Sequence, residues 1–293
     1  MKKIKHVFEL LSFSVVYLFM RLLPYRMSSL LMGKLFSSIG PWLPVTSVAY
    51  KNLGLAFPRM SQSRKKEIIK KMWCNLGRVV GEYPKTFKLS KGYLEKHVKI
   101  HGFNNVKKSL KKNKGAIILT GHYGNWENSL AKMTSLGCNM AVVYRKINNP
   151  YIDQAVLKIR GQSGVEQIPK SVFGVKKIIA SLRDNRLVCL LSDQKQNDGI
   201  ASDFFGHKVM TGILASKLAL QRGIDLLPLM SVRGLSKGTD YDIYVEEPIN
   251  IAKGDDLESI TAKINAFYQR WIEKHPEQWF WLHRRWPKNF YKK

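Results

Sequence analysis

Apolar runs that alternate with helix-like segments constrain the fold of this chain more than any other feature. Five runs of strand length stand at residues 115–120, 139–145, 187–194, 225–233 and 241–249. Strands that alternate with helices are typical of a mostly parallel sheet flanked by helices. We therefore predict an α/β fold for a domain that runs from about residue 46 to residue 293.

Helix signals are clearest in four other segments. The spacing of apolar residues predicts helices over 61–82, 151–160, 172–184 and 256–275. Thr211 is predicted to cap a further helix that follows it. Phe204, Phe205 and Gly206 are predicted to shape a loop.

Polar residues follow three of the predicted strands. His122, Arg145 and Asp193 each stand where a strand is predicted to end. In α/β sheets, functional groups gather beyond the carboxyl ends of the strands. Three polar residues in equivalent positions therefore predict a site at this edge of the sheet.

The segment GHYGNWE, residues 121–127, carries the most specific chemistry. On one continuous helix, His122 and Glu127 would point about 140° apart. They meet only if His122 lies in a turn before the helix and Glu127 lies in its first turn. The two glycines permit that turn, and Asn125 is a candidate N-cap. The pattern predicts a general base oriented by a carboxylate, with free helix amides as an oxyanion site; a simple surface pair is the alternative.

Neither a metal site nor a nucleotide site is predicted. The H-E-x-x-H spacing of zinc hydrolases, the P-loop and the G-x-G-x-x-G pattern are all absent. The three cysteines, Cys74, Cys138 and Cys189, stand far apart without paired spacing. This usage favours a reducing compartment without disulfide bonds.

A formal net charge of +28 implies an anionic partner. Basic residues recur over 64–71 and again over 107–114, and we expect this charge to lie around the site. Nucleic acid is one such partner, but helix-turn-helix, zinc-finger and RNP-type motifs are absent. An acidic protein, a phosphorylated substrate or an anionic membrane fits better. A basic membrane-binding protein without enzymatic activity stays open as an alternative.

The first 45 residues are predicted to form a membrane anchor. An apolar stretch from Val7 to Leu23 is interrupted only by Glu9 and Arg21, which leaves it short for a bilayer of about 30 Å. Either a short span or helices that lie in the interface would satisfy this pattern. Two buried helices of a soluble domain are the alternative. The chain thus divides into an anchor, 1–45, and a catalytic domain, 46–293.

Several blocks together resemble one protein family. They are YKNLGLAFP (50–58), GHYGNWE, VYRKINNPYID (143–153), LLSDQ (190–194), DFFGHKVMT (203–211) and HPEQWFWLHRRWP (275–287). In this order they resemble the late acyltransferases of lipid A biosynthesis, the lauroyl and myristoyl transferases of Gram-negative bacteria. Acyltransferases that act on phosphatidylinositol mannosides also look similar.

The resemblance implies transfer of a fatty acyl chain from acyl carrier protein to a hydroxyl of a Kdo-bearing lipid A precursor. It implies a glycerolipid-acyltransferase-like fold at the inner membrane, facing the cytoplasm, with no cofactor beyond the acyl donor. Another anionic lipid, such as a phosphatidylinositol mannoside or a lysophospholipid, is the alternative acceptor.

Residue roles follow from the same resemblance. His122 would take the hydroxyl proton and Glu127 would orient His122. We expect substrate contacts from Arg145, Asp193, Gln194, Asn125 and Tyr144. The loop of Phe204, Phe205 and Gly206 is expected to shape the acyl pocket. An ion pair between Arg145 and Asp193 is the structural alternative. Trp279, Trp281 and Trp286 are expected either at a lipid headgroup surface or in the core.

Overall fold

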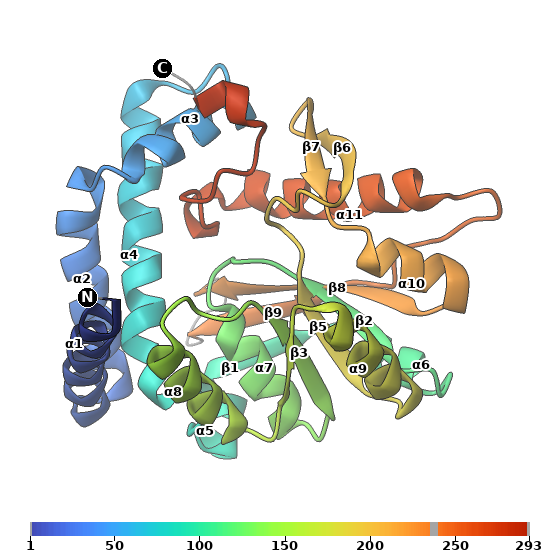
Figure 1. The fold of residues 1–293 in the computed structure, drawn as a ribbon, viewed down its shortest axis with the longest axis horizontal. Coiled ribbons are helices and arrows are strands. Elements are labelled where there is room, and N and C mark those ends of the chain that lie inside the picture. The colour runs from blue at the N-terminus through green and yellow to red at the C-terminus, as the bar shows by residue number, and fades with distance from the viewer. Residues whose placement is uncertain (1, 235–239, 292–293) are drawn as a thin grey trace.

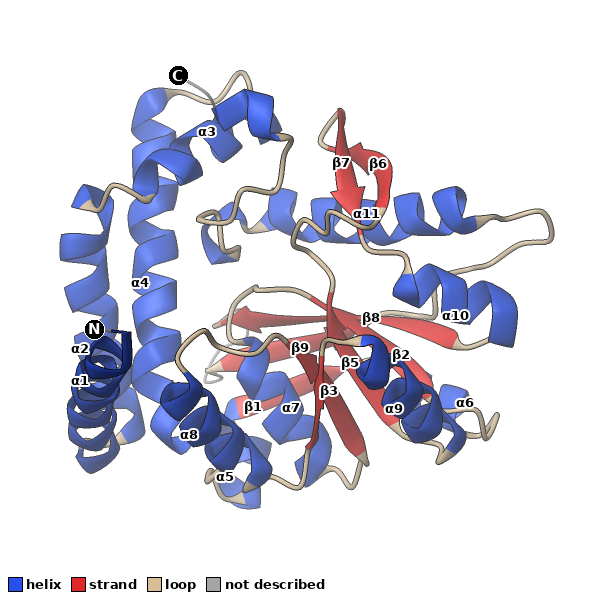
Figure 2. Ribbon diagram, in the orientation of Figure 1, coloured by secondary structure: helices blue, strands red, loops and turns tan. Residues whose placement is uncertain are grey.

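A seven-stranded sheet forms the centre of the fold (Figure 2). The computed structural model describes residues 2–234 and 240–291. The sheet order is β1-β9-β8-β2-β5-β3-β4. Strands β8, β2, β5, β3 and β4 are parallel, β9 runs antiparallel to β8, and β1 is parallel to β9. The prediction of a mostly parallel sheet flanked by helices is confirmed.

All five predicted strands are present in the sheet. They are β2 (Ala116–Thr120), β3 (Met140–Tyr144), β5 (Leu187–Leu191), β8 (Asp225–Arg233) and β9 (Tyr241–Val245). Two strands of this sheet were not predicted, β1 (Val98–His101) and β4 (Glu166–Pro169). Each of these has four residues at an edge of the sheet and is only partly buried, so neither forms a continuous apolar run.

Helices cover both faces of the sheet (Figure 1). They are α5 (Lys91–His97), α6 (Phe103–Leu110), α7 (Trp126–Ser135), α8 (Pro150–Gly161), α9 (Val172–Arg183), α10 (Leu214–Arg222) and α11 (Leu257–Lys274). Residues of α5, α6 and α7 pack in one core cluster. Residues of α9, α10 and α11 pack in the other, so the sheet separates two cores.

Four helices precede the sheet: α1 (Lys2–Leu22), α2 (Tyr25–Ile39), α3 (Thr46–Ala56) and α4 (Gln62–Thr86). Helices α2 and α4 approach closely, because a Cβ on Gly77 or Gly81 would meet a backbone oxygen of α2 within 2.3 Å. Helix α1 packs on α4 and α8. Among the described helices, none is long and apolar enough to cross a bilayer. The division at residue 45 stays a prediction.

A hairpin lies where the sequence suggested only a loop. Strands β6 (Ile200–Phe204) and β7 (His207–Thr211) pair antiparallel, and both turn residues, Phe205 and Gly206, have positive φ. The prediction that Thr211 caps α10 is wrong. Thr211 ends β7 and accepts a hydrogen bond from the buried Arg285, while α10 begins after Ile213 without a side-chain cap.

The three C-terminal tryptophans belong to the core. Trp279, Trp281 and Trp286 are almost fully buried, and Trp279 packs edge-on against Trp281. Phe204 and Phe205 join this aromatic cluster. The alternative of a lipid headgroup surface is therefore wrong for these residues, because no bilayer reaches a buried indole.

Three short 3₁₀ helices complete the fold. They are Gly40–Trp42, Pro276–Gln278 and Lys288–Tyr291. The second of them precedes the segment that crosses the carboxyl edge of the sheet and contacts the turn after β2.

Candidate active site

The turn between β2 and α7 has the geometry that the glycines and the asparagine predict. Asn125 caps α7, and its Oδ1 accepts hydrogen bonds from the amides of Glu127 and Asn128. Gly124 has φ +55°, and a Cβ there would lie 1.9 Å from the Ser231 carbonyl oxygen. Only glycine fits both the backbone angle and the space. The result places His122 in the turn and Glu127 in the first helical turn, as predicted.

The carboxylate that holds the His122 ring is Asp193. His122 Nδ1 lies 2.9 Å from Asp193 Oδ1, and the His122 backbone amide donates to Oδ2 over 2.8 Å. Trp279 Nε1 donates to the same Oδ2 over 2.9 Å. Because an ionised carboxylate only accepts hydrogen bonds, Nδ1 carries the proton and Nε2 keeps its lone pair. Nε2 is therefore the basic nitrogen of the ring.

Asp193 is held in its charged form despite its burial. Burial alone would raise the pKa of Asp193, but the positive charge that His122 carries when protonated, together with the hydrogen bonds from His122 and Trp279, holds this pKa below its ordinary value. The side chain is 2 % exposed and that of His122 is 25 % exposed. A buried charged acid beneath a partly open imidazole is the arrangement of a base and its orienting group.

The predicted pairing of Glu127 with His122 is wrong. The Glu127 carboxylate forms a buried ion pair with Arg160 of α8, and Arg160 Nε donates to Oε2 over 3.2 Å. Asp193 takes its place because β5 lies beside β2 in the sheet, so that the residues following these two strands meet. The amides of Glu127 and Asn128, which we expected to be free for an oxyanion, are bound to Asn125.

The other predicted substrate contacts lie in different environments. Arg145 is exposed and forms no ion pair with a described residue, so the alternative pairing with Asp193 is wrong. Tyr144 and Gln194 are partly buried at the same edge of the sheet. Asn125 is fully buried and both ends of its amide bind within the protein, so it supports the turn rather than a substrate.

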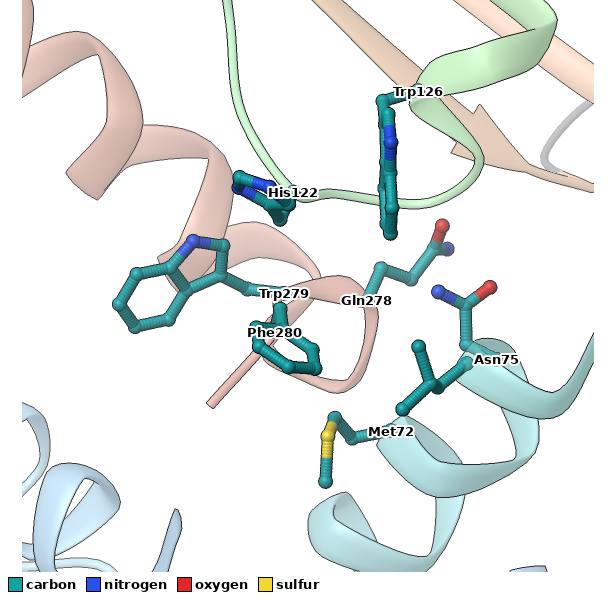
Figure 3. Close-up of a pocket in the computed structure, with 8 residues that line it drawn as sticks. Met72, Asn75, His122, Trp126, Gln278, Trp279 and Phe280 are labelled. Carbon is teal, nitrogen blue, oxygen red and sulfur yellow. The ribbon is translucent and has the colours of Figure 1, made fainter. Parts of the chain in front are cut away.

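A small cavity of about 10 Å³, room for about one water molecule, lies beside His122 (Figure 3). Its walls come from α4, from the turn and from the C-terminal segment: Met72, Asn75, Leu76, His122, Trp126, Gln278, Trp279 and Phe280. Trp126 packs edge-on against the imidazole at 5.1 Å between ring centres. Most of these side chains are apolar or aromatic. Apolar side chains therefore line the space next to the base, and this space would have to open to admit an apolar chain.

Sequence reasoning missed the walls of this cavity. Phe204 and Phe205, predicted to shape an acyl pocket, lie in the aromatic core and not in this wall. The C-terminal segment reaches the site because the amides of Phe280 and Gly124 bond across to His122 and Gln278, each over 3.0 Å. In the sequence, this segment is visible as the aromatic block 275–287. The spacing of its residues does not predict where the block lies in the fold.

A buried network holds the turn from the side of α4. Glu82 accepts hydrogen bonds from the side-chain amide of Asn125 over 2.6 Å and from the guanidinium of Arg233 over 2.6 Å. Arg233 also donates to Asn75, whose amide in turn donates to the Gly124 carbonyl over 2.9 Å. Two consecutive residues of the turn are thus fixed by α4 and β8. The position of His122 depends on these contacts.

We expected the basic segment 107–114 to lie near this site, and that prediction is wrong. It ends α6 and leads into the amino end of β2, whereas His122 follows the carboxyl end of that strand. Among residues 2–234 and 240–291, no group of three or more His, Cys, Asp or Glu side chains is placed to hold a metal ion.

A second histidine, His283, supports the loop that carries Asp193. Its Nε2 accepts a hydrogen bond from the Lys195 amide over 3.1 Å. Burial lowers the pKa of His283 to about 4. The folded protein therefore binds fewer protons at this ring than the unfolded chain between pH 4 and pH 6.5, and its stability rises with pH across that window.

We expect the free energy of unfolding to fall as the pH is lowered from 6.5 to 4, and to fall less in His283→Gln, whose side chain still accepts the Lys195 hydrogen bond without titrating. The difference between the two curves should be of order 1–3 kcal/mol. Urea unfolding at several pH values measures it. Parallel curves for both proteins would contradict this role of His283.

Comparison with known proteins shows the family of this chain. Residues 3–288 match the sequence profile of the bacterial lipid A biosynthesis acyltransferases. The chain belongs to this family. It is 23% identical over 267 residues to a lipid A biosynthesis palmitoleoyltransferase of Escherichia coli K12, covering 90% of this chain and 86% of that protein. The resemblance seen in the sequence blocks is thus confirmed.

Relatives in the comparison differ in what their names say they transfer or acylate. A lauroyltransferase of lipid A biosynthesis from Escherichia coli K12 is 22% identical over 241 residues, which is 81% of this chain and 78% of that protein. A phosphatidylinositol mannoside acyltransferase of Mycobacterium tuberculosis CDC 1551 is 26% identical over 193 residues, 64% of this chain and 59% of that protein. Membership in the lipid A acyltransferase family therefore leaves the substrate of this chain to be tested.

Proposed function

We propose that the protein transfers a fatty acyl chain, lauroyl or myristoyl, from acyl carrier protein to a hydroxyl of a Kdo-bearing lipid A precursor. The observation that carries this proposal is the His122–Asp193 pair at the apolar cavity: Nδ1 is held by the carboxylate, and no described residue bonds Nε2. Family membership supports the reaction class. No cofactor beyond the acyl donor is part of the proposal.

The reaction needs one group that acts first as a general base and then as a general acid. His122 Nε2 takes the proton of the acceptor hydroxyl while its oxygen attacks the thioester carbonyl. Asp193 stabilises the imidazolium that forms. When the tetrahedral intermediate collapses, the carbon–sulfur bond breaks and the leaving sulfur takes the proton from Nε2. An ester and a thiol result, and the enzyme regains its starting state without an acyl-enzyme.

Anionic acceptors suit the charge of the protein. Arg145 is exposed at the carboxyl edge of the sheet, where its planar guanidinium is suited to a phosphate or a sugar carboxylate. Tyr144 and Gln194 lie at the same edge. We assign to them contacts with the acceptor sugar. A net charge of +28 attracts phosphorylated lipid.

Mass spectrometry tests the reaction. Detergent-solubilised protein is mixed with a Kdo-bearing tetra-acylated lipid A precursor and lauroyl or myristoyl carrier protein, and the product is expected to gain one acyl group. His122→Ala should abolish that gain. No gain with any donor, for folded wild-type protein, overturns the lipid A assignment. Phosphatidylinositol mannosides and lysophospholipids are then the acceptors to test, since a relative is named for the former.

The N-terminal helices supply the surface for an anionic inner leaflet facing the cytoplasm. Helix α1 exposes an apolar stripe at helical spacing: Ile4, Phe8, Leu11, Val15, Leu18 and Leu22. Helix α2 exposes Met27, Leu30, Leu31 and Leu35, and Trp42 beyond it is 86 % exposed. Contiguous exposed apolar patches of this kind mark interaction surfaces, and Arg21, Arg26 and Lys34 add positive charge beside them. We place these helices in the membrane interface.

Phe8→Asp/Val15→Asp should lower the vesicle-bound fraction at least tenfold in co-sedimentation with phosphatidylglycerol-containing vesicles. The reason is that both side chains leave water when the stripe enters the interface. Gln62→Asp/Ser63→Asp adds the same charge at exposed positions of α4 and serves as the control. Equal loss in both variants would show that net charge alone holds the protein on the vesicle.

A further inference from the structure

A second exposed apolar group lies at the start of α9, away from the N-terminal helices. Val172 is 82 % exposed and Phe173 is 75 % exposed. Three lysines surround them. Lys176 Nζ lies 5.9 Å from the centre of the Phe173 ring, Lys177 is four residues beyond Phe173 on the same helix, and Lys170 precedes the helix. We call Lys170, Val172, Phe173, Lys176 and Lys177 the α9 patch.

The sheet places the α9 patch on the same edge as His122. The order β2, β5, β3, β4 sets His122, Asp193, Arg145 and Lys170 behind successive parallel strands. The Lys170 amide donates to the Tyr144 carbonyl over 2.8 Å, which fixes the patch beside Arg145. Three strand spacings of about 4.8 Å separate β2 from β4, or about 14 Å. The patch is thus a short distance along the surface from the reacting nitrogen.

The two chain segments that form this region carry basic but no acidic side chains. The sequence holds no Asp or Glu between residues 167 and 183, or between residues 139 and 152. Arg145 lies between the patch and His122 and leaves that stretch of surface cationic too. Two exposed apolar side chains with lysines beside them complement the surface of an acidic protein that exposes a few apolar side chains.

We propose that the α9 patch is the docking site for the acidic carrier protein that bears the acyl thioester. This inference rests on the proposed function. The carrier holds its acyl group on a long flexible arm, so the protein body docks at a distance from the base while the thioester reaches His122. Docking about 14 Å from the base along the sheet edge meets that requirement.

A carrier protein fits the α9 patch better than a bilayer does. The patch has two large, highly exposed apolar side chains, whereas α1 and α2 expose an extended apolar surface. Figure 1 shows α9 well apart from α1 and α2, with α8 between them. The lipid surface and the donor surface are therefore separate, which lets the acceptor arrive from the membrane and the donor from solution.

The test compares two donors in one transfer assay. Lys170→Glu/Lys176→Glu/Lys177→Glu should lower kcat/KM for the acyl carrier protein thioester at least tenfold and weaken its salt dependence. With the corresponding acyl-pantetheine thioester, which lacks the protein, the variant should stay within twofold of wild type. Val172→Ser/Phe173→Ser should show the same selective loss. Lys108→Glu/Lys111→Glu/Lys114→Glu makes an equal charge change at the amino end of β2 and should leave both donors within twofold.

Three outcomes overturn the docking site. They are an equal loss with both donors, an equal loss in the Lys108 control, and a loss of binding to phosphatidylglycerol vesicles by the patch variant, which would make the patch a lipid surface. Failure of the proposed function is a different result, because wild-type protein would then use neither thioester. In that case, fluorescence anisotropy with labelled holo carrier protein still measures docking, and binding weakened by the patch substitutions but not by the control supports it.

Discussion

Asp193→Asn is expected to lower kcat by up to about 10⁴, the loss seen when the acid that orients a catalytic histidine is replaced by its amide. Asp193 accepts three hydrogen bonds, two from His122 and one from Trp279. An asparagine has one accepting oxygen and one donating NH₂. Its NH₂ beside Nδ1 moves the ring proton to Nε2, which then cannot take a proton from the acceptor hydroxyl. The transfer assay at saturating donor measures kcat.

Glu127→Gln is the matched control for Asp193→Asn. It makes the same chemical change in another buried carboxylate of this region, but its partner is Arg160 and not His122. We expect a lower unfolding midpoint, because the substitution leaves the Arg160 charge unpaired. Rates are compared at a temperature where circular dichroism shows both variants folded. If Asp193→Asn keeps kcat within tenfold while folded Glu127→Gln loses as much as His122→Ala, Glu127 is the orienting residue after all.

The contrast between these two carboxylates shows where sequence reasoning succeeds. The turn after β2 was predictable because its signals are local: glycine at a position of positive φ, and asparagine at a helix start. The pairing of His122 with Asp193 joins residues 71 apart in the chain. The sequence pattern placed both residues at strand ends, but it does not determine the order of the strands. Because β2 and β5 are adjacent in the sheet, Asp193 rather than Glu127 meets the imidazole ring.

Other misses have the same physical origin. Thr211 has the residue type and place of a cap, but Arg285 reaches it from the far end of the chain, over 2.8 Å. The C-terminal tryptophans stand beside cationic residues in the sequence, which is compatible with a surface position and with a core position. Residue spacing does not show which neighbours cover an indole. Arg285 itself is buried with oxygen acceptors from Met210, Thr211 and Asn265. Long-range packing, which spacing cannot encode, determined each outcome.

Glu82→Gln is expected to lower the free energy of unfolding by about 3–5 kcal/mol, the cost of leaving one partner of a buried ion pair without its charge. Glu82 and Arg233 are both deeply buried, and Arg233 Nη1 lies 2.6 Å from Glu82 Oε1. Burial alone would raise the pKa of Glu82, but the Arg233 charge and several hydrogen bonds hold it below the ordinary value. Its contribution is therefore present above the unfolded-chain pKa and lost as the pH falls through the folded-state pKa.

The double variant Glu82→Gln/Arg233→Met separates charge from packing. Once both charges are gone, no unpaired ion is buried, so we expect it to regain much of the stability that Glu82→Gln loses. Urea unfolding of the wild type, both single variants and the double variant gives the coupling energy.

The same pair fixes Gly124 and Asn125 through Asn75 and the side-chain amide of Asn125. Activity should consequently remain low in the double variant even where stability returns, because the turn that carries His122 has lost its supports. A single variant within 1 kcal/mol of wild type, or a double variant with full kcat, would mean that this network does not hold the active site.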